Sequence, residues 1–200
     1  MTFRAKSILA LLFVSGLVLA GCGESEPWHS TNMAGSLPKL AFTMTRADTG
    51  EETTAADFRG KVVLLFFGYT YCPDVCPTTL ANVSAILKRL GSDADATRVL
   101  FVTVDPDRDT LDVLKSYTGL FAPQVVGLRG TPDQLAAFAR RYRVSYSVSQ
   151  GDEDHPYQVT HSSAVYVFDQ TGAIRLLLSS LSTPKPDLDG AAEDLKRLIE

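Results

Sequence analysis

Residues 61–77 read KVVLLFFGYTYCPDVCP, and this stretch determines the fold class that the sequence indicates. After the initial lysine, residues 61–67 are a continuous apolar run with a glycine on either side. A run of this length and β-branched content is typical of a strand buried on both faces, as in a parallel or mixed sheet. After Pro77, apolar residues recur at helical spacing as far as Gly91. Two cysteines therefore lie between a buried strand and a helix.

The rest of the chain alternates strands with helices. A strand at 41–45 is followed by a turn signal at 48–50, and Thr131–Gln134 has the pattern of a capping box with proline at the first helical position. This order predicts a thioredoxin-like α/β sandwich: a central mixed sheet flanked by helices, with an extra N-terminal strand pair and a hairpin insertion. Further strands are predicted over residues 99–104, 125–128, 144–148, 164–168 and 174–178, and helices around residues 111–117, 132–142 and 188–199.

Residues 1–21 have the features of a bacterial lipoprotein signal peptide. Arg4 and Lys6 precede an apolar stretch of about a dozen residues, which is short for a spanning helix of roughly 20. The stretch ends in Leu-Ala-Gly-Cys at 19–22, which resembles the lipobox of lipoprotein signal peptidase. Cys22 is therefore predicted to carry a lipid that anchors the protein to a membrane. An uncleaved anchor and an ordinary secretory signal with an incidental Cys22 are the alternatives.

A flexible tether is predicted over residues 22–38, and the folded domain over residues 39–200. The tether segment is rich in Gly, Ser, Glu, Pro, Thr and Asn and has almost no apolar periodicity. His29 lies in it and is interpreted as a tether residue. Removing residues 1–21 takes away two basic residues and no acidic one, so the formal net charge of −4 becomes −6. An acidic surface argues against nucleic acid as a partner.

The number of cysteines isolates a working pair. Of the three cysteines, lipidation would use Cys22, which leaves Cys72 and Cys76, four positions apart. A bridge closing so short a loop restrains little of the unfolded chain, so an exported protein with this pair is either redox-active or a metal binder. A helix beginning near Pro77 would bring its positive end close to Cys76 and favour a thiolate there. Either function needs thiolates.

The cysteine spacing favours metal. Thiol oxidoreductases of this fold usually carry C-x-x-C, whereas three residues separate Cys72 from Cys76. Two thiolates alone could hold a linear Cu(I), and a nitrogen ligand would make the site trigonal and able to accept Cu(II). His161 and His155 are the candidates for that ligand. The loop entering the strand at 164–168 lies beside the cysteine loop in a thioredoxin-like fold, which favours His161, although a hydrogen-bonded loop histidine is an equal alternative.

Two aspartates are candidates for an outer layer of the site. Asp105 follows the buried strand at 99–104 and could orient the histidine or interact with Arg108. The favoured alternative is a turn that starts at Pro106 before a capped helix. Asp74 could be a weak outer ligand, and a solvated loop carboxylate is the simpler interpretation.

With these residues assembled, the chain resembles the Sco/SenC family. The resemblance covers about residues 42–198, and its anchors are residues 57–61, 67–70, the C-P-D-V-C-P loop, 104–106, 108–110 and 161–162. Members of that family are thioredoxin-fold copper proteins that help to assemble the dinuclear copper centre of cytochrome c oxidase. The resemblance implies that Cys72, Cys76 and His161 are copper ligands. Two positions depart from the family: Tyr71 stands where histidine is often found, and Thr160 where aspartate is often found.

The resemblance implies a copper metallochaperone for Cu(I) or Cu(II). Its implied partners are subunit II of a terminal oxidase and an upstream periplasmic copper donor, so the protein would act on the periplasmic side of a bacterial membrane. The alternative is a thiol:disulfide oxidoreductase acting on the cysteines of subunit II, in which Cys72 and Cys76 form the redox-active pair. A redox sensor is a third hypothesis.

Overall fold

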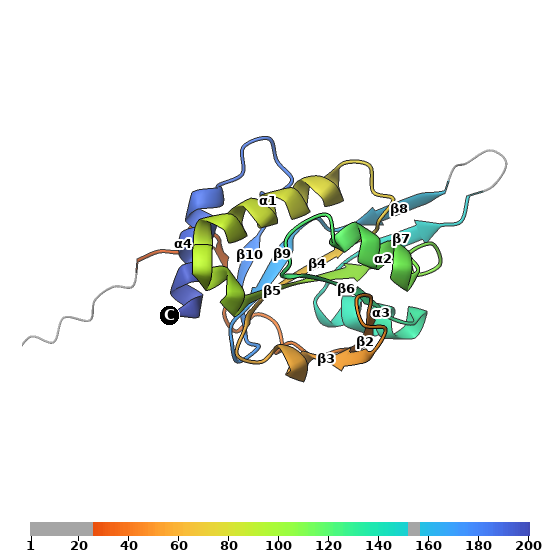
Figure 1. Ribbon diagram of the computed structural model, residues 1–200, viewed down its shortest axis with the longest axis horizontal. Helices are drawn as coiled ribbons and strands as arrows, with labels where there is room; N and C mark the ends of the chain where they lie inside the picture. The colour runs from red at the N-terminus through yellow and green to blue at the C-terminus, as the bar shows by residue number, and fades with distance from the viewer. Residues whose placement is uncertain (1–25, 152–156) are drawn as a thin grey trace, which may run out of the picture.

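The structure, a computed structural model, describes residues 26–151 and 157–200. Its main sheet has the strand order β1-β10-β9-β4-β5-β6-β2-β3 (Figure 1). β4, β5 and β6 run parallel at the centre, and antiparallel strands flank them on both sides. The strands are β1 (Thr31–Asn32), β2 (Thr43–Arg46), β3 (Glu52–Thr54), β4 (Val62–Gly68), β5 (Thr97–Thr103), β6 (Val125–Arg129), β9 (Val165–Phe168) and β10 (Ile174–Leu178).

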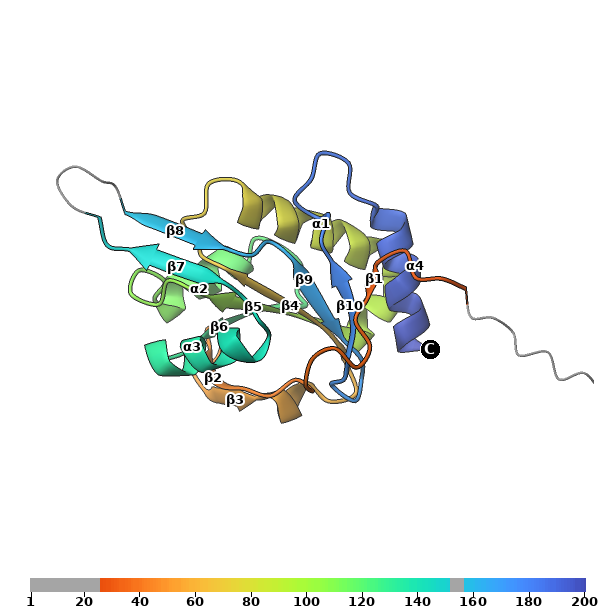
Figure 2. The same cartoon turned by 180° about the vertical axis from the view of Figure 1, so that it is seen from behind.

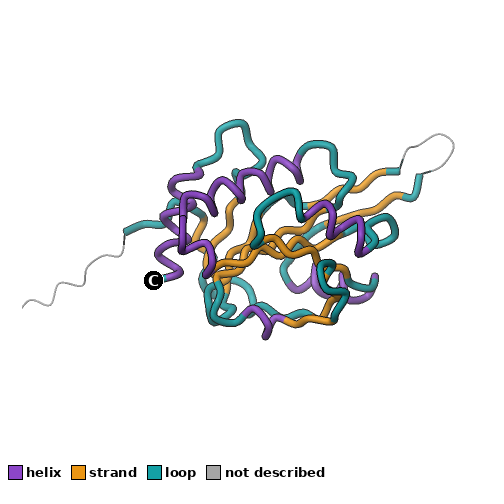
Figure 3. Tube along the Cα trace, in the orientation of Figure 1, coloured by secondary structure: helices purple, strands orange, loops and turns teal. Residues whose placement is uncertain are grey.

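Helices cover both faces of this sheet, and a second sheet lies beyond it. Figure 3 shows the strands running between the helical layers. The second sheet is an antiparallel pair of β7 (Tyr146–Ser149) and β8 (Gln158–His161). The helices are α1 (Val75–Leu90), α2 (Leu111–Thr118), α3 (Pro132–Arg141) and α4 (Leu188–Ile199), with 3-10 turns η1 (Ala55–Phe58) and η2 (Gly91–Ala96). In the part of the chain that the structure describes, no helix is both long and apolar enough to span a membrane.

β4 confirms the central prediction from the sequence, because all seven of its residues are buried. Its side chains alternate between two layers. Phe66 packs against Phe101 on the face that carries α1 and α2, whereas Phe67 packs against Phe138 of α3 on the other face. The capping box at Thr131 and the bounds of α4 are also as predicted. The fold is therefore the expected mixed α/β sandwich.

The sheet topology determines where the candidate site lies. β4 and β5 are parallel and in register up to the pair Gly68–Thr103, so their carboxyl ends meet at one edge of the sheet. The cysteine loop follows β4 there, and residues 104–110 follow β5. Such an edge is a common place for binding sites in α/β folds. β7 and β8 approach the same end of the molecule, away from α4 (Figures 1 and 2).

The prediction of a flexible tether over residues 22–38 is wrong from Trp28 onward. Thr31–Asn32 pairs with β10, and the backbone N–H groups of His29 and Ser30 donate to the buried carboxylate of Asp194, at 3.1 and 2.7 Å. Arg197 also lies 3.9 Å from the ring centroid of Trp28. These contacts are made by backbone groups and one aromatic ring. Such contacts produce no apolar periodicity, so the sequence pattern did not reveal them. The segment from Trp28 onward therefore packs against α4 and β10.

β8 is the other element that the sequence did not reveal. Residues 159–163 are predicted to be a loop, and the structure instead has a strand, Gln158–His161, over the first three of them. The predicted strand at 144–148 is displaced to Tyr146–Ser149. The predicted signal peptide, Cys22 and His155 lie outside the described residues.

Candidate metal centre

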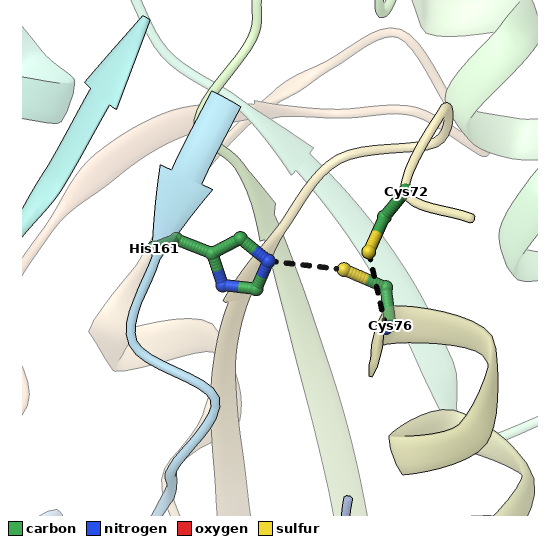
Figure 4. Close-up of side chains that lie close together, drawn as sticks. All are labelled: Cys72, Cys76 and His161. Carbon is green, nitrogen blue, oxygen red and sulfur yellow. Dashed lines mark hydrogen bonds between the residues drawn. The ribbon is translucent and has the colours of Figure 1, made fainter. Parts of the chain in front are cut away.

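Three residues from distant parts of the chain converge at the edge of the sheet. Cys72 lies in the loop after β4, Cys76 in the first turn of α1, and His161 at the end of β8 (Figure 4). Their Sγ and imidazole nitrogen atoms all lie within 4.8 Å of one another. For comparison, two ligands on opposite sides of a metal ion with bonds of roughly 2.0–2.3 Å are about 4.0–4.6 Å apart. The three groups are therefore close to the spacing that one ion requires.

His161 presents a free lone pair to the cysteines. Its Nδ1 lies 2.9 Å from the carbonyl oxygen of Ser162, which can only accept, so Nδ1 carries the proton and donates. In a neutral imidazole the other nitrogen, Nε2, is then an acceptor. Nε2 lies 3.2 Å from Sγ of Cys76, so its lone pair is directed at that sulfur. A metal ion that replaces the thiol proton would find a nitrogen and a sulfur already aligned.

Two aromatic rings surround the imidazole. Phe66 and Tyr69 meet it edge to face, with centroid distances of 5.9 and 5.8 Å. Such contacts restrict rotation of the ring, so the hydrogen bond to Ser162 and the two aromatic neighbours together fix the direction of Nε2.

The two thiols are inequivalent. Cys76 is completely buried, and Cys72 is partly exposed. α1 begins at Val75 rather than near Pro77, so the N–H of Cys76 belongs to the first turn and donates to Sγ of Cys72 at 3.3 Å. The hydrogen bond from the Cys76 thiol, together with bonds from backbone N–H groups, lowers the pKa of Cys72 against the opposing effect of burial. The same hydrogen bond and burial raise the pKa of Cys76.

This result corrects the prediction that the helix end favours a thiolate at Cys76. The positive end of α1 acts on Cys72, because the N–H of Cys76 points at its neighbour rather than at its own sulfur. Cys72 also lines an open pocket of about 330 Å³, together with Tyr69, Pro73, Val159 and His161. The exposed sulfur is therefore also the ionised one, and a ligand can reach it from solvent.

Gly68 makes room for the buried sulfur, a role that the sequence did not reveal. A Cβ atom at this position would lie 3.0 Å from Sγ of Cys76 and still closer to the Phe101 ring. Real Cβ atoms rarely come so near, and neither neighbour is free to move in a packed core. The glycine at the end of β4 therefore allows Cys76 to lie against the strand.

Asp109 is a second residue whose role sequence reasoning missed. Its buried carboxylate accepts hydrogen bonds from the N–H and hydroxyl of Thr70, at 3.0 and 2.6 Å, and from the hydroxyl of Thr103 at 2.5 Å. Burial raises its pKa. Thr110, rather than Asp109, caps α2. Asp109 thus fastens the start of the cysteine loop to the end of β5.

The two predicted outer aspartates differ in their surroundings. Asp74 is exposed and accepts a bond of 3.3 Å from the hydroxyl of Thr78. Asp105 is buried and accepts from Nε of Arg108 and from the hydroxyl of Tyr157, both at 2.6 Å. Of the two roles predicted for Asp105, the structure shows the interaction with Arg108. The backbone of Ser162 takes the histidine-orienting role.

Comparison with known proteins identifies the family. The family model described as SCO1/SenC matches residues 34–200. The chain belongs to the SCO1/SenC family. The SCO2 homolog of Mus musculus is 36% identical over 179 residues, which are 84% of this chain and 70% of that protein. The SCO1 homolog of Homo sapiens is 38% identical over 177 residues, and the match spans 84% of this chain and 58% of the human protein. Both relatives are described as mitochondrial.

Solved structures of Sco proteins have the same fold. ScoI of Bradyrhizobium japonicum, described with copper bound, has a TM-score of 0.70 at 36% identity and covers 80% of this chain and 98% of its own. Yeast Sco1, also described with copper bound, has a TM-score of 0.69 at 32% identity, with coverage of 80% and 90%. A family lipoprotein from Bacillus anthracis has a TM-score of 0.70 at 25% identity, with coverage of 86% and 100%. The thioredoxin-like fold predicted from the sequence is confirmed.

The inequality of the two thiols predicts their order of reaction. In the reduced, metal-free protein, iodoacetamide should modify Cys72 first and reach Cys76 only after unfolding, because one sulfur is accessible and ionised and the other is neither. Because the pKa of Cys72 is lowered, its rate should change little between pH 8 and 6, whereas an ordinary thiol loses about tenfold per pH unit. Peptide mass mapping after timed quenching measures both. Equal labelling of the two cysteines would contradict this assignment.

Proposed function

We propose that this protein is a copper metallochaperone that binds one copper ion through Cys72, Cys76 and His161 and assists assembly of the dinuclear copper centre of a respiratory cytochrome c oxidase. The observation that carries the proposal is the convergence of these three ligand atoms within 4.8 Å. Two thiolates and an imidazole are the donor set that suits copper. Family members with 36% and 32% identity that are described with copper bound support the choice of metal.

The geometry suits a cargo site that both binds and releases its ion. Two thiolates are sufficient for Cu(I), and the imidazole completes a trigonal site for Cu(II). Cys76 and His161 form the fixed inner side, while Cys72 faces the open pocket. A partner's sulfur could therefore attack the ion from the side of Cys72. Subunit II of the oxidase is the proposed acceptor, and a periplasmic copper protein the proposed donor.

A thiol:disulfide oxidoreductase is the second candidate. Cys72, whose pKa is lowered, and its buried neighbour Cys76 form the usual arrangement of an attacking and a resolving thiol. Such a protein would act on the cysteines of subunit II or serve as a redox sensor. It would have no need of His161 as a ligand, so substitution of that residue separates the two functions.

Deletion of the gene tests the proposed function in the cell. Oxidase activity should fall, because its copper centre would not be filled, and added copper should restore part of the activity by supplying the ion without a carrier. Respiration with an oxidase-specific electron donor measures this, and a gene copy with Cys76→Ser is the matched negative control. Normal oxidase activity together with altered resistance to disulfide stress would support the redox function instead.

The proposed location is the periplasmic side of a bacterial membrane, with a lipid on Cys22 as the anchor. Acyl chains on Cys22 would give firm anchoring, because each methylene buried in the membrane contributes about 0.8 kcal/mol. Cys22→Ser should therefore release the protein into the soluble fraction after cell breakage. Fractionation with immunodetection measures this, and Cys72→Ser is the control that should stay with the membrane. Retention of the Cys22→Ser protein would indicate an uncleaved anchor.

A further inference from the structure

Four side chains beside the metal centre form a connected cluster, which we call the latch: Tyr71, Asp105, Arg108 and Tyr157. The guanidinium of Arg108 lies 3.7 Å from the ring centroid of Tyr157 and 4.8 Å from that of Tyr71. Its Nε donates to one oxygen of Asp105, and the hydroxyl of Tyr157 donates to the other. Burial, followed by the bond to Asp105, raises the pKa of Tyr157 to about 12, so the hydroxyl remains a donor at neutral pH.

The latch joins three segments that the main sheet does not hold together. Tyr71 immediately precedes Cys72, whereas Asp105 and Arg108 lie in the loop after β5. Tyr157 immediately precedes β8, whose last residue is His161. Among the described residues, β8 pairs with β7 and has no ladder to the main sheet. The strand that carries the histidine is therefore attached to the cysteine side partly through side chains.

The interactions of the latch resist displacement of its side chains. Asp105 is 1% exposed, so its charge requires both of its donors. Arg108 is about one-third exposed and gains from the faces of the two tyrosine rings. Because one carboxylate receives the arginine and the Tyr157 hydroxyl on different oxygens, a shift of β8 would break a bond at a buried charge.

We infer that Tyr157 is a positioning residue for the metal centre: through Asp105 and Arg108 it holds β8 where His161 can reach Cys76. Only the short strand β8 separates Tyr157 from His161. The latch therefore fixes the start of β8, and the metal centre fixes its end. Loss of the latch loosens the strand that carries the histidine while leaving both cysteines in the β4–α1 unit. Tyr157 thereby controls the third ligand and, with it, the preference for Cu(II) over Cu(I). This inference rests on the proposed copper function.

Three variants test it. Tyr157→Ala removes both the ring and the hydroxyl, Tyr157→Phe removes the hydroxyl alone, and Gln158→Ala is the control at the adjacent exposed position, the first residue of β8. Tyr157→Ala should weaken Cu(II) binding by about tenfold or more, the usual effect of losing an outer partner, and Cu(I) binding by less than about threefold. Tyr157→Phe should fall between Tyr157→Ala and the parent, and Gln158→Ala should match the parent. Competition titrations measure both affinities, and electron paramagnetic resonance reports whether an imidazole nitrogen is bound.

A second measurement needs no copper. In the metal-free protein, amide hydrogen exchange in β7 and β8 should be faster in Tyr157→Ala than in the parent and unchanged in Gln158→Ala. The latch is overturned if Tyr157→Ala binds Cu(II) as the parent does, or if it loses both oxidation states equally, as a merely destabilised protein would. A parent that binds no copper would instead refute the proposed function. Hydrogen exchange would then decide on the latch alone, and unchanged exchange in Tyr157→Ala would overturn it.

Discussion

His161→Ala is expected to weaken Cu(II) binding by more than about a hundredfold, because loss of a ligand should exceed the 10–100-fold effect of losing an outer partner. Cu(II) needs the imidazole to complete its coordination, whereas Cu(I) can be held by the two thiolates. Cu(I) affinity should therefore change far less. The Nε2 atom that points at Cys76 is the group removed. Parallel titrations with chelators selective for each oxidation state measure the difference.

The matched control is His29→Ala, which removes a histidine that contacts Glu193 on α4 rather than the site. It should bind both forms of copper as the parent does. Disulfide exchange through Cys72 should be nearly unchanged in His161→Ala, since both thiols remain. A His161→Ala protein that binds Cu(II) like the parent would remove the histidine from the site.

Asp109→Ala is expected to lower the free energy of unfolding by about 3 kcal/mol or more, because three donors would lose a charged acceptor in the core. A native domain has only about 5–15 kcal/mol in total. Thr70 would lose both of its bonds to the end of β5, so the loop before Cys72 should also loosen. Urea unfolding measures the stability. Accelerated alkylation of Cys76 in the folded protein would report the loosened loop.

Asp109→Asn is the isosteric partner of this variant and adds a pH test. The raised pKa of Asp109 means that the folded state binds its proton more tightly than the unfolded state. The stability that this gives is full below the unfolded pKa of about 4 and is lost as pH rises through the folded value. Asparagine has no such contribution, so the cost of Asp109→Asn should be larger at pH 4 than at pH 7. A cost that grows with pH instead would contradict the assignment.

The elements that the sequence predicted well carry their signal in their own residues. β4 is one uninterrupted apolar run, and the burial of all seven of its residues follows from that. The capping box at Thr131 is local in the same sense. The cysteine pair was isolated by counting, and its place between strand and helix needed no tertiary information.

The missed features depend on contacts between distant segments. β8 has a single partly buried apolar residue, Val159, so nothing in its pattern distinguishes it from a loop. The packing of Trp28 onto α4 uses a carboxylate and an arginine that lie more than 160 residues away. Which thiol ionises depends chiefly on the hydrogen bond from the Cys76 thiol to Cys72 and also on the N–H of Cys76, which points at Cys72 because α1 starts two residues earlier than predicted.

The central claim is that one copper ion is held by two sulfurs and one imidazole nitrogen. Copper X-ray absorption of the Cu(II)-loaded protein tests it most directly, because the spectrum counts the atoms bound to the metal. The expected result is one copper per chain with two sulfur ligands and one nitrogen ligand. In His161→Ala the nitrogen should be lost, and in Cys72→Ser or Cys76→Ser a sulfur should be lost. A parent spectrum with fewer than two sulfurs, or a nitrogen that persists in His161→Ala, would contradict the claim.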